Sequence, residues 1–285
     1  MGSDLRIGIS GWTYAPWRGV FYPDGLSHAK ELGYASRQFN SIEINGTHYS
    51  LQRPEVFRRW YDQTPEGFVF SVKASRYITH LRRLRDVEIP LANFFASGVL
   101  GLEEKLGPFL WQFPPGFQFD ADVMNGFLKL LPKTTSAAAK LAARHDEKVQ
   151  GRSLLKTGGN RRLRHCLEVR HSSFLVPEFF GLLRRYHMAF VFADTAGKWP
   201  YAEELTSDFV YVRLHGDRQI YVSGYTAEAL QDWAGRIRSW RDGEQHGAKG
   251  RERTQGSRDV YVYFDNDVKV RAPFDAQELR RLAEG

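Results

Sequence analysis

The sequence predicts a single (β/α)8 barrel, the TIM-barrel class, and three observations support this prediction. Short runs rich in β-branched and aromatic residues recur along the whole chain. Helical patterns with recognisable first residues lie between them. The chain has 285 residues, a length that such barrels commonly use as one unit, and its composition shows no break. We therefore expect one domain over residues 1–285.

Each predicted element has its own signal. The expected strands are 6–12, 41–45, 68–75, 108–113, 165–170, 189–194, 209–215 and 260–265. Helix starts are marked by Pro54, Asp120, Pro177 and Thr226, and the last helix is expected to begin at Asp275 with a capping box. Because strand and helix alternate to the end, a parallel sheet is expected, and eight units favour a closed barrel over an open sheet.

The strand at 41–45 places an acidic residue between two isoleucines. Side chains alternate along a strand, so Ile42 and Ile44 share one face, and Glu43 and Asn45 share the other. Helices cover the outside of a barrel, and the isoleucines should face them. Glu43 is therefore expected to point into the barrel.

The same alternation predicts a cluster of charged side chains inside the barrel, near the carboxyl ends of the strands, where barrel enzymes build their sites. The acids expected there are Glu43, Glu168, Asp194 and Asp265, and the bases are Lys73, Arg170 and Arg213. An ion-pair network that closes the barrel is the structural alternative. We favour a functional site, because burying ions is costly and ionisable clusters at strand ends usually mark one.

Roles can be assigned to these residues by their chemistry. Arg and Lys suit phosphate or carboxylate oxygens, ionised Glu can act as a general base, and His can transfer a proton near neutral pH. The candidate catalytic residues are Glu43, Glu168, Asp194 and His215. The candidate substrate-binding residues are Trp12, Asn45, Lys73, Arg76, Gln112, Arg170, Arg213, Asp265 and Asn266.

No metal or other cofactor is assigned. A divalent metal could be held by Glu168, Asp194 and His215, but the neighbouring cations disfavour it. Cys166 lies two residues before Glu168 on the same strand face, so we expect it to pack in the barrel rather than to act as a nucleophile.

The net charge of +7 is unevenly distributed. Residues 144–165 carry seven Lys or Arg against two acids, and residues 241–258 form a Gly- and Arg-rich run that is typical of a flexible connection. We interpret 136–163 and 241–258 as variable basic insertions. Both precede a strand, so they are expected on the amino-terminal face of the barrel, away from the site.

Membrane and secretory signals are absent from the sequence as read. No apolar run approaches the roughly 18 residues that a membrane span needs, and residues 1–4 lead into a strand without a signal-peptide pattern. The single cysteine cannot form an internal disulfide. We expect a cytoplasmic protein, and no protein partner is predicted.

Several motifs carry a family resemblance. The segments ISGWTY (9–14), WRGVFYP (17–23), EINGTHY (43–49), FSVKASRYITH (70–80), QFPP (112–115), EVRH (168–171), YVRLHG (211–216) and VYFDND (262–267) resemble the domain of unknown function 72 family, also called YecE-like. The resemblance implies a (β/α)8 barrel without an established reaction. It also implies a distant likeness to the barrels of the endonuclease IV group, which cut DNA at abasic sites with a metal cluster. Strand positions that a cluster of metal cations would avoid are occupied here by Lys73, Arg170 and Arg213. We therefore do not transfer the zinc mechanism to this chain.

Three functional hypotheses follow. The first is a barrel mouth that binds an anionic, phosphate-bearing substrate such as DNA or RNA, with phosphodiester chemistry, because aromatic and basic residues mix on the rim. The second is a hydrolase or lyase for a sugar or carboxylate compound with Glu43 and Glu168 as acid and base. The third is a binding protein without catalysis.

Overall fold

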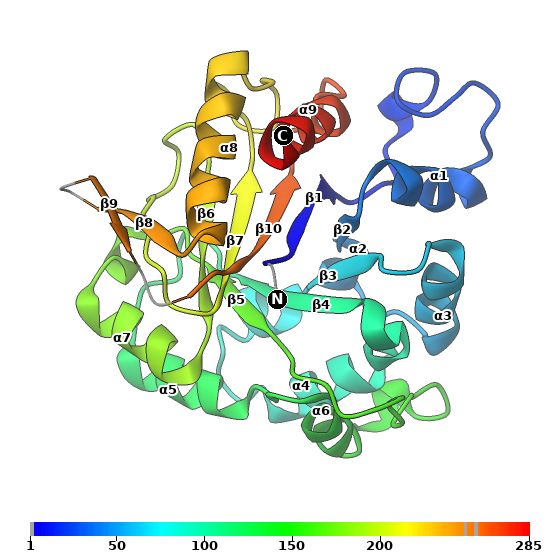
Figure 1. Cartoon of the computed structure of the whole chain (residues 1–285). Coiled ribbons are helices and arrows are strands. Elements are labelled where there is room, and N and C mark those ends of the chain that lie inside the picture. Colours follow the sequence, from blue (N-terminus) through cyan, green and yellow to red (C-terminus); the bar gives the residue numbers. More distant parts are fainter. Residues whose placement is uncertain (1–2, 248–249, 254–255) are drawn as a thin grey trace.

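A closed barrel of parallel strands forms the centre of the molecule. The structure is a computed structural model that describes residues 3–247, 250–253 and 256–285. Helices surround the barrel, whose strand order is β1-β10-β7-β6-β5-β4-β3-β2 (Figure 1). The barrel strands are β1 (Leu5–Ser10), β2 (Ser41–Ile44), β3 (Val69–Lys73), β4 (Leu106–Gln112), β5 (His165–Glu168), β6 (Ala189–Asp194), β7 (Phe209–Leu214) and β10 (Asp259–Phe264). All eight coincide with predicted strands, so the (β/α)8 prediction is confirmed.

Helices connect the strands and cover their outer faces. They are α1 (Glu31–Gln38), α2 (Gly46–Tyr49), α3 (Pro54–Gln63), α4 (Glu88–Ala96), α5 (Ala121–Leu130), α6 (Thr135–Ala142), α7 (Pro177–Tyr186), α8 (Ala227–Arg241) and α9 (Ala272–Glu284). Asp120 and Thr226 accept hydrogen bonds from free backbone N–H groups of α5 and α8, as N-cap residues do. In the described part of the chain, no helix is both long and apolar enough to cross a membrane.

The start of the last helix differs from the prediction. Helix α9 begins at Ala272, with Pro273 in its first turn, and not at Asp275. The Asp275 carboxylate instead accepts hydrogen bonds from the Tyr225 backbone N–H (3.1 Å) and from Asn266 Nδ2 (2.8 Å). Asp275 therefore ties the loops after β7 and β10 to the helix.

The barrel interior is apolar toward the amino ends of the strands and polar toward their carboxyl ends. Leu110, Cys166, Tyr211 and Tyr263 pack together inside the barrel. Cys166 is a buried free thiol, as expected for a packing residue. On the outer face, side chains such as Ile42 and Ile44 join the layer between strands and helices. The alternation in β2 is therefore as predicted, and Glu43 faces inward.

Strand β6 has the opposite side-chain direction from the prediction. Ala189, Val191 and Ala193 face the interior, whereas Phe192 packs outward against Trp240 of α8. β6 is apolar on both faces, so no alternation of polar and apolar residues shows which of its side chains face the barrel interior. The small residues occupy the narrow interior and the phenylalanines face the helices. Asp194, which follows the phenylalanine parity, is consequently directed out of the barrel.

Part of the basic segment 144–165 lies at the carboxyl end of the barrel, contrary to the prediction. Helix α6 reverses the chain direction and packs on α4. Arg144 Nη2 then meets Glu88 Oε2 of the first turn of α4 (2.9 Å), and Lys148 Nζ lies 5.3 Å from the ring centre of Tyr77. The chain returns afterwards, and Arg164 pairs with Asp259 at the amino end of β10 (2.6 Å). An added helix thus moved part of the segment to the rim.

The run 241–258 is structured where it is described. Strands β8 (Glu244–Gly247) and β9 (Gly250–Arg253) form a two-stranded antiparallel sheet outside the barrel. The prediction of a flexible connection is therefore wrong for these residues. Positions 248–249 and 254–255 lie outside the described residues.

Gly8 allows β1 and β2 to approach each other closely. A Cβ atom at this position would lie 1.8 Å from the backbone oxygen of Ser41, which a neighbouring strand holds in place. We expect Gly8→Ala to lower the free energy of unfolding by about 3 kcal/mol or more, because overpacking against backbone cannot relax. Urea denaturation measures this change.

Gly126→Ala is the matched control for that substitution. Gly126 lies in α5, and its Cβ position has no neighbouring atom within 4 Å. We expect a gain of about 0.5–1 kcal/mol from helix propensity. Equal effects of the two variants would contradict the close approach of β1 and β2.

Candidate functional site

A charged layer closes the carboxyl end of the barrel interior. Its centre is the guanidinium group of Arg213 from β7, which is fully buried. Arg213 follows Tyr211 on the inward face of β7, and Ala193 of β6 pairs with it across the strands. Because Ala193 is small, the arginine side chain has room to cross the barrel. It reaches side chains from β1, β2, β5 and the loop after β10.

Three carboxylates share the charge of Arg213. Its Nη2 lies 2.9 Å from Glu43 Oε1 and 2.9 Å from Asp265 Oδ2, and its Nη1 lies 2.8 Å from Glu168 Oε2. Its Nε donates to Glu43 Oε2 (3.1 Å). The charges of these acids outweigh the effect of burial, which alone would lower the pKa of Arg213, and raise it well above its ordinary value. Arg213 is permanently charged and fully engaged by the protein.

Both oxygens of Glu43 have several donors. Oε1 accepts from Ser10 Oγ and Arg213 Nη2, and Oε2 accepts from Tyr211 Oη (2.6 Å) and Arg213 Nε. Ser71 Oγ lies 2.6 Å from the Tyr211 hydroxyl and extends this network to β3. Glu43 is fully buried. With each oxygen occupied, the carboxylate is suited to holding the arginine rather than to taking a proton from a substrate.

Glu168 has a similar environment on the opposite side. Its Oε1 accepts from Gln112 Nε2 (2.8 Å) and Arg170 Nε (3.1 Å), in addition to the contact of Oε2 with Arg213. Burial would raise the pKa of Glu168, but the charges of Arg213 and Arg170 outweigh burial and hold the pKa well below its ordinary value. Gln112 and Arg170 therefore lie at the predicted site, where they position Glu168.

His215 and Asp265 complete the contacts around Arg213. His215 Nε2 lies 3.2 Å from Arg213 Nη1, and His215 Nδ1 lies 3.0 Å from Asp265 Oδ2. A guanidinium N–H can only donate, so Nε2 accepts and the ring proton belongs on Nδ1, facing Asp265. Burial would raise the pKa of Asp265, but Arg213 and His215 lower it below its ordinary value. The rings of Trp199 and Tyr221 cover His215.

Lys73 is the exception in this layer. It follows Ser71 on the inward face of β3, and its side chain is buried, with 8 % exposed. Within the described residues, its ammonium group has no hydrogen bond and no ion pair, although it lies close enough to Asp265, Glu43 and Glu168 to interact with their charges. Burial, followed by the charge of Arg213, lowers the pKa of Lys73 to about 8.

Further positive charge gathers on the same side of the mouth. Arg76 is exposed after β3. The rings of His48 and His80 contact each other, with 5.1 Å between their centres. Burial and the charge of Lys73 lower the pKa of His48 to about 3 and that of His80 to about 4. His48 and His80 are therefore neutral near pH 7, and the charge there comes from Lys73, Arg170 and Arg76. We call these three residues the cationic side.

The opposite side carries an acid that the sequence prediction did not include. Asp267 follows Asp265 in the loop after β10, and its Oδ1 atom is buried without a hydrogen-bond partner in the described structure. Burial and the charge of Asp265 raise the pKa of Asp267 well above its ordinary value. The alternation that selected Asp265 continues to Asp267 in the segment 262–267, and this signal could have found it.

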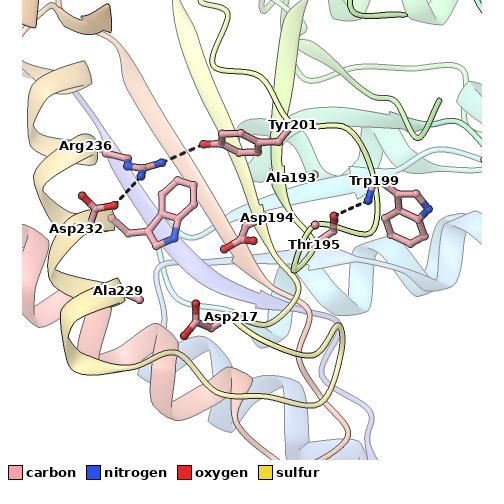
Figure 2. A pocket seen from close by; sticks show the side chains of 11 residues that line it. Ala193, Asp194, Thr195, Trp199, Tyr201, Asp217, Ala229, Asp232 and Arg236 are labelled. Carbon is pink, nitrogen blue, oxygen red and sulfur yellow. Dashed lines mark hydrogen bonds and ion pairs between the residues drawn. The ribbon is translucent and has the colours of Figure 1, made fainter. Parts of the chain in front are cut away.

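Asp194 is not part of the charged layer. Its Oδ2 accepts from the Tyr225 hydroxyl (3.0 Å), and it lies in a separate cavity of about 360 Å³ between the loops after β6 and β7 and helix α8. Figure 2 shows Asp194 near Asp217 in this cavity, with Arg236 bonded to Tyr201 and Asp232. Burial raises the pKa of Asp194. The prediction that Asp194 joins Glu43 and Glu168 is therefore wrong, because β6 has the opposite parity.

Three other predicted residues lie at the edge of the site. Asn45 Nδ2 donates to Ser10 Oγ (3.0 Å), so it contacts the charged layer. Trp12 turns outward and packs edge to face on Trp60 of α3. Asn266 donates to Asp275 and to the Ser223 carbonyl group, which directs its amide away from Arg213. Trp12 and Asn266 therefore shape the rim rather than contact the charged layer.

The displaced Asp194 also removes the proposed metal ligand set. Among the residues that the structure describes, no three His, Cys, Asp or Glu side chains are grouped so as to hold a metal ion. Glu168 and His215 both contact Arg213, whose charge opposes a bound cation. The site has the chemistry of an ion-pair layer with an open cationic side.

A groove of about 400 Å³ adjoins the cationic side. The exposed rings of Tyr49 and Tyr77 line it, 69 % and 40 % exposed, together with Arg82, Lys148 and two acids, Asp86, which pairs with Arg82 (3.0 Å), and Asp146. Ser75, two residues after Lys73, also lines the groove. Aromatic and basic side chains thus continue outward from the barrel mouth.

Fold and site define a class: a (β/α)8 barrel protein with a buried ion-pair layer at its carboxyl-terminal mouth. Comparison with known sequences then assigns the family. Residues 6–285 match the family described as "Protein of unknown function DUF72", and the chain belongs to this family.

Relatives share parts of the sequence. The chain is 30% identical over 164 residues to the UPF0759 protein YecE of Escherichia coli K12, an alignment that covers 55% of this chain and 57% of YecE. It is 31% identical over 121 residues to the UPF0759 protein YunF of Bacillus subtilis, covering 40% and 41%. The chain thus spans about half the length of the curated relatives it matches, 57% of YecE and 41% of YunF.

Solved structures share the fold. A DUF72 family protein from Thermotoga maritima superposes with a TM-score of 0.76 at 23% identity, covering 99% of this chain and 100% of that one. One from Enterococcus faecalis superposes with a TM-score of 0.71 at 15% identity, covering 99% and 96%. These likenesses support the same barrel architecture.

We expect Glu168→Gln to destabilise the protein by roughly 3–5 kcal/mol, because it removes one partner of a buried ion pair and leaves Arg213 and Arg170 undercompensated. Urea denaturation at neutral pH measures the change. Glu284→Gln is the matched control: it removes an exposed pair with Arg280, which should cost less than about 1 kcal/mol. Equal losses in the two variants would show that the buried pairs do not stabilise the barrel.

Stability should fall in acid through Glu168 and Asp265. Their folded pKa values are depressed, so at acid pH the unfolded state binds more protons, and stability rises with pH. The contribution of these acids is complete above their ordinary values of 4.5 and 3.8 and is lost as pH falls toward the depressed values. Denaturation between pH 6 and pH 2 should show a shallower slope for Glu168→Gln than for the wild type. Identical slopes would contradict the depressed pKa of Glu168.

Proposed function

We propose that the barrel mouth binds a phosphate-bearing ligand on its cationic side, at Lys73, Arg170 and Arg76, and that a nucleic acid is the ligand class. The observation that carries the proposal is Lys73, a residue that is only 8 % exposed and whose ammonium group no described residue pairs with. A largely buried lysine without a partner costs free energy that a bound anion offsets.

Arg170 supports the same ligand chemistry. Its guanidinium carbon lies over the Trp199 ring, 3.7 Å from the ring centre, and only its Nε is bonded, to Glu168. Within the described residues, its two terminal nitrogens have no hydrogen bond or ion pair. Such a fixed fork matches two oxygens of a phosphate group. Arg213, predicted as a ligand contact, is instead occupied by the protein's own carboxylates.

The groove beside the cationic side favours a nucleotide over a free anion. With a phosphate at Lys73 and Arg170, a base or sugar would extend toward the exposed rings of Tyr49 and Tyr77. Base stacking on aromatic side chains supplies about 1–3 kcal/mol per base without sequence preference. Lys148, which α6 brings to this rim, offers a charge to a neighbouring phosphate that Asp146 beside it offsets in part.

Phosphodiester chemistry would draw on the acidic side of the mouth. Asp265 is ionised, 14 % exposed and able to orient a water, and Asp267 with its raised pKa can donate a proton. The second hypothesis is a hydrolase that uses Glu43 and Glu168 as acid and base. It loses support because both carboxylates are fully buried and bonded to Arg213.

We expect Arg170→Met and Lys73→Met each to weaken the binding of nucleoside monophosphates and of single-stranded oligonucleotides about tenfold or more, since each removes a charge-assisted contact. Isothermal titration calorimetry measures the affinities. The wild-type affinity should fall steeply with salt, and each variant should show a shallower salt dependence.

Lys129→Met is the matched control, because Lys129 is exposed on α5, away from the mouth. Its affinity should equal that of the wild type. Equal affinities for wild type, Arg170→Met and Lys73→Met would overturn the proposal. Salt-independent binding of an uncharged saccharide would point to the sugar hypothesis instead.

A further inference from the structure

We propose that the Lys73 amine is a nucleophile that forms an imine with the carbonyl carbon of an aldehyde or ketone that also carries a phosphate group. This inference rests on the proposed phosphate site and deepens it by naming the second functional group of the ligand. In such a ligand the phosphate lies at Arg170 and Arg76, the two arginines of the cationic side, and the carbonyl carbon takes the place at Lys73 that a phosphate alone would occupy.

The position of Lys73 suits this chemistry. It is the last residue of β3, at the carboxyl end of the barrel where reacting groups of this fold lie. Its side chain points inward above Ser71, whose hydroxyl is bonded to Tyr211, and 8 % of the side chain reaches solvent. A small ligand can approach the amine only from the mouth.

The surroundings leave the amine free to react. Ionised Lys73 would be expected to pair with an acid, yet Asp265, Glu43 and Glu168 all direct their oxygens to Arg213. The carboxylates are thus held by Arg213, which is more basic than Lys73, and the Lys73 nitrogen has no bond to them. In its neutral form, its lone pair is available to a ligand. An amine needs such desolvation beside another cation to become nucleophilic near neutral pH.

The electrostatic environment agrees with this geometry. With a pKa of about 8, Lys73 has a neutral fraction at pH 7 on the order of a hundredfold larger than that of an exposed lysine with its ordinary pKa. The neutral amine is the reacting form. The burial that lowers the pKa of Lys73 also limits the access of bulk water to the imine.

The covalent step balances without another reactant. The lone pair of Lys73 Nζ attacks the carbonyl carbon, the C=O π bond opens, and a proton passes from nitrogen to oxygen to give a carbinolamine. The second amine hydrogen and the hydroxyl group then leave as water, and a C=N bond forms. The carbonyl oxygen and both amine hydrogens therefore end in one water molecule.

Borohydride trapping tests the inference. The protein is incubated with ribose 5-phosphate and sodium borohydride, which adds hydride to the imine carbon and fixes the sugar as a secondary amine. Intact mass and peptide mass spectrometry locate the adduct. We expect one adduct, at Lys73, with a labelling rate that rises with pH and levels off above about pH 8.

Two variants make the result specific. Lys73→Arg keeps a positive charge but cannot form an imine, and it should lose the adduct. Lys269→Arg removes an exposed lysine in the loop after β10 and should label like the wild type. Adducts spread over exposed lysines, with Lys73 unmodified in the folded protein, would overturn the inference.

The two proposals fail in different ways. Equal labelling of Lys73 by ribose 5-phosphate and by an unphosphorylated aldehyde, glyceraldehyde, would support imine formation and contradict the phosphate site. Phosphate binding that depends on Arg170, measured by calorimetry with inorganic phosphate and without an adduct at Lys73, would support the phosphate site and overturn the imine. Preference for the phosphorylated sugar, lost in Arg170→Met, supports both.

Discussion

The charge of Arg213 is the constraint on which the mouth of this barrel depends. A guanidinium group buried in the barrel interior is tolerated only when anions and acceptors surround it, because its desolvation costs several kcal/mol. Glu43, Glu168 and Asp265 meet that requirement from three different segments, and Ser10 accepts a further hydrogen bond (3.0 Å). These contacts join β1, β2, β5, β7 and the loop after β10 at one point. The ion-pair layer is therefore part of how the barrel is closed.

The same layer divides the mouth into two sides of opposite character. Because Arg213 takes the carboxylates, Lys73 and Arg170 keep positive charge that is not fully compensated, whereas Asp265 and Asp267 lie close together across from them. Burial is the main cause of the lowered pKa values of His48 and His80 and of the raised pKa of Asp267, and the neighbouring charge adds to each shift. That added charge is positive at the two histidines, from Lys73, and negative at Asp267, from Asp265. The structural and the functional interpretation of this cluster are thus compatible: Arg213 closes the barrel, and Lys73 is the residue to which our proposal assigns ligand binding.

The sequence predicted the barrel because strand and helix signals alternate, and it predicted most of the layer because one polar residue between apolar neighbours sets the direction of a strand. Glu43 in β2 and Arg213 in β7 are such residues. The prediction is wrong for Asp194 because β6 is apolar on both faces. The direction of its side chains is decided by their sizes, and which size fits on each face depends on the strands and helices opposite. The prediction also misplaced Lys148, because nothing local signals that α6 turns the chain back toward the rim. The division of partners between Arg213 and Lys73 depends on distances across the barrel, which no single strand encodes.

Lys73 differs from several inward polar groups near it, which have partners: Ser71 with Tyr211, Ser41 with Tyr263, Gln112 with Glu168. A protein built for stability alone would place an apolar side chain at this position, since a largely buried lysine without an ion pair lowers stability. Local violations of this kind are expected where a group must remain available to a ligand. On our proposal, an anion or a carbonyl carbon that enters the mouth offsets this cost, which would link the one unpartnered cation of the described layer to function rather than to folding.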